Sequence, residues 1–231
     1  MHISHSQLKH LETVIGQMTR FDRPADAVLS AYFREHNKLG GADRHLIAET
    51  AFGALRRLIQ LRALIAPEKA TPRRLALVAL MKFNKLNVKE LTEATSAGER
   101  EWLGTVKGKT LEDSLEIRAE LPQWVIERLG EQEPSAVEAL GQGLMSMAPL
   151  DLRVNTLKMK REELLDRLNA EGIHCEATPY SPLGIRLKDK PALSKHELFK
   201  AGAFEVQDEG SQLLGLITGA RRGEMVVDFC A

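Results

Sequence analysis

The chain has 231 residues, enough for one large domain or two small ones, since domains commonly hold about 100–200 residues. Hydrophobic residues make up 43% and charged residues 28%, which is typical of a folded soluble protein and argues against a largely disordered chain. The N-terminus lacks a signal-peptide pattern, and no segment approaches the roughly 18 apolar residues of a membrane span. We therefore expect a cytoplasmic protein with no membrane partner.

Metal and disulfide chemistry find little support in the composition. Cys175 and Cys230 lie far apart in sequence, and the seven histidines show no metal-ligand spacing. We expect two free thiols and no metal.

The net charge is zero, but residues 1–75 carry 12 Lys and Arg against 7 Asp and Glu. Such a bias can attract phosphate groups, although charge runs are more often solvated helix faces.

Residues 1–146 show the periodicity of helices. Apolar residues of the first predicted helix recur at spacings of three and four: Leu8, Leu11, Ile15 and Met18. Residues 43–65 predict one long amphipathic helix, and Thr71 followed by Pro72 is a typical start for the next one. Together these patterns predict a bundle of short helices.

The segment "GTVKGKT", residues 104–110, resembles a phosphate-binding loop only superficially. That loop needs four residues between its glycines, whereas Gly104 and Gly108 enclose three. No buried strand precedes it. We predict a lysine-rich loop between two helices instead.

The pattern changes near Pro149. "LDLRVNTLK", residues 150–158, alternates apolar Leu152, Val154 and Thr156 with polar residues, as a half-buried strand does. A helix follows, then a predicted hairpin over residues 175–188, and a helix over residues 211–217 for which Asp208 is the expected cap. Residues 149–220 therefore predict a small α+β module. "MVVDF", residues 225–229, has the pattern of a further buried strand, but without neighbouring strands we expect residues 224–231 to be frayed or paired with an exposed edge of another molecule.

The first strand of this module carries a candidate RNA-binding set. Arg153, Asn155 and Lys158 would lie on its polar face and at its exit. A guanidinium, an amide and an ammonium group suit contacts to phosphates and base edges of single-stranded RNA. The alternative is an exposed strand face with ordinary polar residues.

Three motifs in order resemble the Sun, or RsmB-type, RNA cytosine-5 methyltransferases. They are "LDLRVNTLK", "GAFEVQDEGSQLLG" and "GEMVVDFCA". The helical region, most of all "DRHLIAETAFGALRR", resembles the NusB-type RNA-binding domain that often precedes them. The resemblance implies a mainly α protein: a NusB-like bundle over 1–146, an α+β RNA-binding module over 149–220, and over 221–231 the first strand of an incomplete Rossmann-like methyltransferase domain.

The same resemblance implies an activity and its cofactor. In the family, the strand ending in Cys-Ala leads into a glycine-rich loop that approaches S-adenosylmethionine. Asp228, Cys230 and Ala231 would be an incomplete part of that site, and the chain would be truncated before the loop. The catalytic cysteine would lie downstream of Ala231, so we expect this fragment to bind no S-adenosylmethionine and to be inactive.

The expected partner is RNA, ribosomal RNA in the first instance, and Arg56 and Arg57 of the helical region join the predicted RNA-binding residues. Two other functions remain open. One is a stand-alone NusB-like RNA-binding or antitermination factor, which the buried-strand pattern at the C-terminus argues against. The other is a helical adaptor for proteins, which RNA affinity of an exposed face with Arg56, Arg57, Arg73 and Arg74 would argue against.

Overall fold

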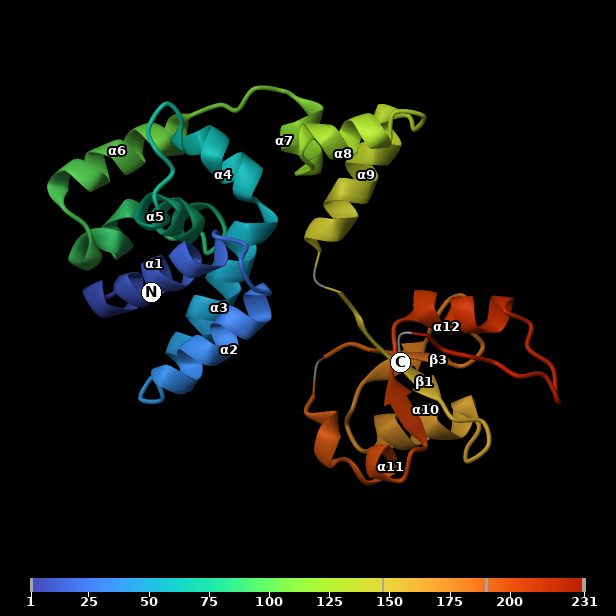
Figure 1. Cartoon of the computed structure of the whole chain (residues 1–231). Coiled ribbons are helices and arrows are strands. Elements are labelled where there is room, and N and C mark those ends of the chain that lie inside the picture. Colours follow the sequence, from blue (N-terminus) through green and yellow to red (C-terminus); the bar gives the residue numbers. More distant parts are fainter. Residues whose placement is uncertain (1, 147, 190, 230–231) are drawn as a thin grey trace. The chain divides into compact units, whose positions relative to one another are not determined.

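The computed structural model describes residues 2–146, 148–189 and 191–229, and the chain divides into two units, residues 1–146 and 147–231 (Figure 1). The first unit is helical. Its α-helices are α1 (His5–Met18), α2 (Ala25–Glu35), α3 (Gly41–Arg56), α4 (Leu58–Ile65), α5 (Pro72–Lys82), α6 (Ala97–Gly108), α7 (Leu115–Ala119), α8 (Gln123–Arg128) and α9 (Pro134–Met145), with a 3-10 helix, η1, over Val88–Ala94.

Helix α5 forms the centre of this unit. Every residue from Leu75 to Met81 is buried, and α1 and α3 pack against it (Figure 1). The Thr71 hydroxyl caps α5 by accepting a hydrogen bond from the Arg74 backbone N–H at 3.3 Å, with Pro72 in the first turn as predicted. The predicted apolar stripe of α1 is also confirmed, because its four residues all lie in the core.

Two sequence predictions in the first unit were wrong. The helix predicted over residues 43–65 is divided at Arg57, whose φ of −128° ends α3 before α4 begins. The loop predicted over residues 104–110 is helical as far as Gly108. There a capping box between Ser96 and Glu99 starts α6, and burial of Leu103 and Val106 holds it in place despite its glycines.

Helices α7 to α9 surround a separate small core formed by Ala119, Leu121 and Val137. Helix α9 approaches the end of α7 very closely, because a Cβ atom at Gly141 would lie 2.0 Å from the carbonyl oxygen of Ala119. Only glycine permits this contact.

The second unit contains a four-stranded antiparallel sheet with strand order β2-β3-β1-β4. Its elements are β1 (Leu150–Val154), α10 (Arg161–Ala170), β2 (Cys175–Ala177), β3 (Gly184–Leu187), η2 (Leu193–Lys195), α11 (Glu197–Lys200), β4 (Phe204–Val206) and α12 (Glu209–Ile217). The predicted hairpin is confirmed as β2 and β3. Strand β4 was missed, since three residues are too few for a periodic pattern, and Thr156 lies beyond β1 and is exposed rather than inward.

One face of the sheet packs on α10. Leu152 and Val154 of β1 lie in a core with Leu164 and Leu168 of that helix. Because alternate residues of a strand point to opposite faces, Asp151 and Arg153 lie on the other face. That face is therefore polar.

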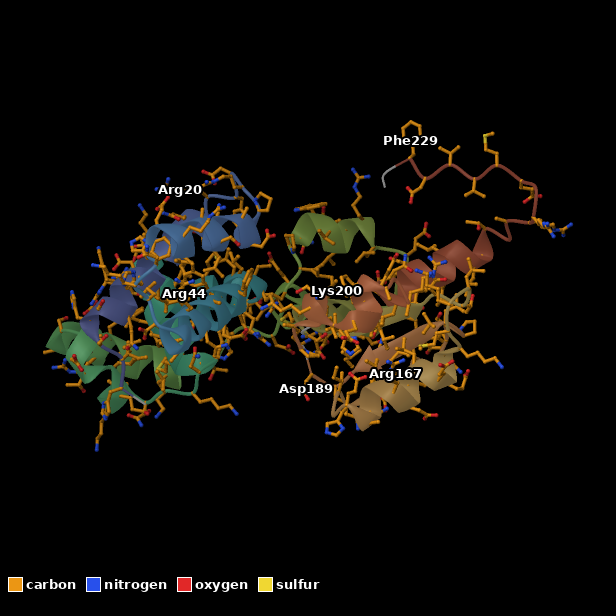
Figure 2. The ribbon with its side chains drawn as sticks, turned by 90° about the horizontal axis from the view of Figure 1, so that it is seen from below. Arg20, Arg44, Arg167, Asp189, Lys200 and Phe229 are labelled. Carbon is orange, nitrogen blue, oxygen red and sulfur yellow. The ribbon has the colours of Figure 1, made fainter. Side chains whose placement is uncertain are left out.

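The segment with the strand pattern, residues 225–229, forms no strand, as expected for a strand without neighbours. Met225, Val226, Val227 and Phe229 are exposed, and Figure 2 shows Phe229 on a segment that lies away from the helices and strands. A strand of this length is stable only when a neighbouring strand pairs with its backbone, and the sheet of this unit does not extend to it.

Candidate nucleic-acid interface

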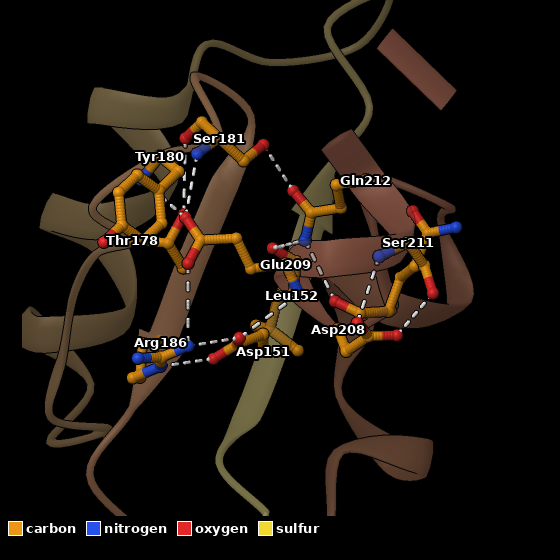
Figure 3. Close-up of polar contacts among 11 residues, drawn as sticks. Asp151, Leu152, Thr178, Tyr180, Ser181, Arg186, Asp208, Glu209, Ser211 and Gln212 are labelled. Atoms are coloured by element: carbon orange, nitrogen blue, oxygen red, sulfur yellow. Dashed lines mark hydrogen bonds and ion pairs between the residues drawn. The ribbon is translucent and has the colours of Figure 1, made fainter. Parts of the chain in front are cut away.

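The polar face of the sheet has two halves that differ in what covers them. In the antiparallel ladders Arg186 of β3 lies opposite Asp151, and Glu205 of β4 lies opposite Arg153. Helix α12 covers the Asp151 end, which we call the closed half (Figure 3). The end with Arg153 and Glu205 is exposed, and we call it the open half.

An ion pair organises the closed half. The Asp151 carboxylate, 1% exposed, accepts hydrogen bonds from Arg186 Nε at 2.8 Å and Nη2 at 2.7 Å. It also accepts one from the Glu209 backbone N–H at 3.3 Å. The Asp151 carboxylate raises the pKa of Arg186, which favours the charged guanidinium.

A second buried carboxylate extends this network to the turn before β3. Glu209 Oε1 accepts hydrogen bonds from the backbone N–H groups of Tyr180 at 2.7 Å and Ser181 at 2.8 Å (Figure 3). Burial opposes ionisation of Glu209, but the hydrogen bonds from these N–H groups hold its pKa below the usual range. Gln212 accepts from the Ser181 hydroxyl at 2.8 Å and donates to the Leu152 carbonyl at 3.2 Å. The network thus fastens the start of α12 to the sheet.

The cap predicted for α12 is confirmed. Asp208 accepts hydrogen bonds from the Ser211 backbone N–H at 3.0 Å and from the Ser211 hydroxyl at 2.5 Å. The "VQDEGSQ" segment therefore has a structural role: it begins α12 and joins it to the sheet.

The open half surrounds a hollow of about 280 Å³ at the end of β1. Its polar and apolar lining consists of Arg153, Val154, Asn155, Thr156, Leu157, Leu183 and Glu205. Arg153 and Glu205 are both exposed, and within the described ranges neither side chain makes a hydrogen bond or an ion pair. These two charged groups are available to a ligand.

The other two predicted RNA-binding residues of this strand hold a turn in place. Asn155 donates from Nδ2 to the Gly202 carbonyl at 3.0 Å and accepts from the Leu157 N–H at 3.2 Å. Lys158 Nζ donates to the Ala201 carbonyl at 2.5 Å. Both side chains therefore tie the turn over residues 155–158 to the turn before β4.

Arg56 and Arg57 form a separate group in the first unit, where α3 ends. The Arg56 guanidinium lies 5.9 Å from the centre of the Phe52 ring, and that of Arg57 lies 5.0 Å from the Phe83 ring. Such stacking leaves the edges of a guanidinium open to a phosphate. Arg73, by contrast, pairs with Glu99 at 2.5 Å.

The hydrogen bond from Arg73 lowers the pKa of Glu99 to about 2. The charge of Arg73 is therefore paired within the protein. Arg74 is likewise occupied, since it lies over the Trp102 ring and donates to the Lys69 carbonyl. Arg73 and Arg74 therefore have structural roles.

Of the residues predicted to contact a cofactor, only Asp228 lies within the described part of the chain. Asp228 lies on the exposed segment after α12, and Cys230 and Ala231 lie outside the described residues. Across the described ranges no three His, Cys, Asp or Glu side chains are arranged to hold a metal, and no helix has the length and hydropathy to cross a bilayer.

Sequence reasoning missed Asp151, Arg186, Glu205 and Glu209. Their partners are 28 or more positions away along the chain, so local periodicity carries no signal for them. Glu205 lies in the three-residue strand β4, which is too short for a periodic pattern to reveal it.

Comparisons with known proteins agree with this architecture. Residues 121–194 match the family described as the RsmF/B-like methyltransferase, ferredoxin-like domain. This match begins in the helices before the sheet and ends before β4. A crystal structure of the protein PH0851 has the same fold, with a TM-score of 0.59 and 16% identity over 97% of this chain and 57% of that one.

Three relatives carry names that include ribosomal RNA small subunit methyltransferase B. The Pasteurella multocida protein is 33% identical over 48% of this chain and 24% of its own length. The Pectobacterium carotovorum protein is 28% identical over 94% of this chain and 56% of its own length. The Bacillus subtilis protein, named as a probable methyltransferase of this type, is 23% identical over 84% and 51%.

The matches cover between 24% and 56% of the length of these relatives. The match nevertheless includes both units, because it reaches 94% of the chain in the Pectobacterium protein. The motifs, the sheet topology and these similarities together support the resemblance of the chain to the Sun/RsmB-type family of RNA methyltransferases.

Proposed function

We propose that this chain supplies the RNA-binding region of an S-adenosylmethionine-dependent methyltransferase that modifies a cytosine at carbon 5 in ribosomal RNA. The names of the relatives support the reaction class and the RNA substrate. The observation that carries the assignment to this chain is the open half of the sheet. There an unpaired, exposed guanidinium borders a hollow on a polar sheet face.

Arg153 can donate hydrogen bonds to RNA. A guanidinium that has no partner in the protein keeps all its N–H donors for a ligand, and phosphates and base edges are suitable acceptors. Four-stranded sheets with one open face are a common platform for single-stranded RNA. In this proposal Asn155 and Lys158 act mainly by holding the edge of that platform.

Methyl transfer requires more than these residues. S-adenosylmethionine would supply the methyl group; of the residues expected to contact it, Asp228 lies on an exposed segment after α12. We propose that the 231 residues alone transfer no methyl group and contribute binding and orientation of the RNA.

The test is the affinity of the chain for single-stranded RNA, measured by fluorescence anisotropy. Arg153→Ala should weaken binding about fivefold to fiftyfold, as the loss of one charge-assisted contact predicts. Affinity should also fall steeply as salt is raised from about 50 to 200 mM.

Arg222→Ala is the matched control, since Arg222 is another exposed arginine of the same unit. It should leave the affinity within about twofold. An unaltered chain that binds no RNA at low salt, or equal losses in the two variants, would contradict the proposed role of the open half.

A further inference from the structure

We infer that the open half recognises one unpaired nucleobase, with guanine preferred, through Arg153 as donor and Glu205 as acceptor. This inference rests on the proposed function, and it adds what the hollow binds. It starts from a feature that a phosphate site would not have, namely a carboxylate directly beside the arginine.

The two side chains are held next to each other by the strand register. Arg153 and Glu205 are direct partners in the β1–β4 ladder, and directly opposed residues have Cβ atoms about 4.5–5.5 Å apart on the same face. Neither forms an ion pair in the part of the chain that the structure describes, so the guanidinium and the carboxylate are both open to a ligand.

The chemistry of this pair favours a base over a phosphate. The negative charge of Glu205 repels a phosphate group, which weakens any site that Arg153 alone would offer. The edge of a base presents donors and acceptors side by side, and so uses both groups. Arginine donates readily to guanine O6, and a carboxylate accepts from base N–H groups.

Guanine fits the pair best because of the number of its donors. Its Watson–Crick edge carries two adjacent N–H donors, at N1 and N2, beside the O6 acceptor. A carboxylate can accept both while the arginine donates to O6. Adenine and cytosine offer only their amino group as a donor on that edge, and uracil offers one N–H donor.

The apolar walls of the hollow suit the flat face of a nucleobase. Leu157 is 95% exposed, and Leu183 borders the other side where the Val154 N–H donates to its carbonyl at 2.9 Å. An apolar side chain so exposed can cover the face of a base. The volume of about 280 Å³ is near the lower end of small-ligand sites, which are about 300–1,000 Å³, and this limits the occupant to a single base.

The hollow is also formed in advance. Asn155 fixes the turn that carries Leu157 by accepting from the Leu157 N–H at 3.2 Å, and Lys158 fastens the other end of that turn. Little ordering is then needed when a base enters, which favours selective binding.

The experiment uses four uridine nonamers whose central position is G, A, C or U, each measured by anisotropy against the full chain. We expect the RNA with central G to bind about tenfold more tightly than the others, within the discrimination of about fivefold to 150-fold usual for a two-bond base contact. Glu205→Gln should reduce this preference to about twofold or less. It should not weaken binding of the all-uridine RNA, since a repulsive charge is removed.

Glu176→Gln is the matched control, because Glu176 is an exposed carboxylate on the edge strand of the same sheet. It should keep the preference for G. Equal affinity for all four RNAs, or an unchanged preference in Glu205→Gln, would overturn the inference.

The design also separates this inference from the proposed function. If the four RNAs bind equally and Arg153→Ala weakens all of them, the open half binds RNA but does not read a base. If none of the RNAs binds, the proposed function itself fails. Thermal unfolding of each variant shows whether its sheet is intact.

Discussion

Arg186 lies directly opposite Asp151 in the β1–β3 ladder and donates two hydrogen bonds to its carboxylate, at 2.8 and 2.7 Å. This pair divides the polar face of the sheet. In the closed half, Glu209 of α12 completes the network around the Asp151–Arg186 pair. In the open half, Arg153 and Glu205 remain exposed. The same strand thus carries one charged residue that is paired within the fold and another, two positions on, that we propose binds RNA.

The first prediction concerns the cost of breaking this pair. Arg186→Met leaves two carboxylates, those of Asp151 and Glu209, close together without their cation. Removing one partner of a buried pair typically costs about 3–5 kcal/mol, and because Arg186 is one-third exposed we expect about 2–3 kcal/mol. Urea unfolding followed by circular dichroism measures it.

The double variant Asp151→Asn with Arg186→Met serves as the comparison, since it also removes one of the two unpaired charges. It should recover at least about 1 kcal/mol of the loss. A single variant within 0.5 kcal/mol of the parent, on the scale of an ordinary surface substitution, would show that the pair is not needed to hold α12.

A second prediction concerns the pH dependence of stability. Glu120 accepts hydrogen bonds from the backbone N–H groups of Ile59 at 2.5 Å and Gln60 at 3.2 Å, at the start of α4. Its burial nevertheless raises its pKa to about 7 from 4.5. The folded state therefore binds more protons than the unfolded state between these values. Stability from this group is fully present below about pH 4.5 and is lost as pH rises through 7.

Glu120→Gln keeps a carbonyl acceptor for the two N–H groups but cannot ionise. Between pH 5 and pH 8, the free energy of unfolding of Glu120→Gln should change by about 1–3 kcal/mol less than that of the parent, after allowance for partial exposure. Glu131→Gln, at an exposed position between α8 and α9, should leave the pH dependence unchanged. Identical slopes for the parent and Glu120→Gln would refute this account.

The third prediction tests the close approach of α9 and α7. Gly141→Ala would place a Cβ atom 2.0 Å from the Ala119 carbonyl oxygen, so one helix must move. We expect a loss of about 1–3 kcal/mol, as is usual for overpacking. Gly143→Ala lies two residues further on in the same helix with open space around it, and should be neutral or stabilising by up to about 1 kcal/mol. Thermal unfolding of the two variants makes the comparison, and equal melting temperatures would contradict it.

The fourth prediction separates structure from binding at the end of β1. Asn155→Ala removes the side chain that joins two turns and should cost about 1–2 kcal/mol of stability. Arg153→Ala removes an exposed side chain without a partner in the fold and should change stability by less than about 0.5 kcal/mol. Chemical unfolding decides between them. If Arg153→Ala destabilises as much as Asn155→Ala, its effect on RNA affinity would report folding.

Local patterns in the sequence were sufficient for the elements that local forces specify. The apolar spacing of α1, the Thr71 cap of α5 and the Asp208 cap of α12 were each predicted and are each present. These features depend on residues within one or two turns of each other. The order of the three motifs likewise indicated the family that the comparisons support.

Tertiary packing decided the rest. The division of the helix at Arg57, the helical course of residues 104–110 and the three residues of β4 depend on which surfaces meet. The arrangement of the open half depends on strand register, because register brings Arg153 and Glu205 together from positions 52 residues apart and joins Asp151 to Arg186 across 35. By itself the sequence therefore determined the local elements and the family. Only the three-dimensional fold decided which of its charged residues pair within the protein and which remain exposed to a ligand, because that choice is made between residues that no local pattern connects.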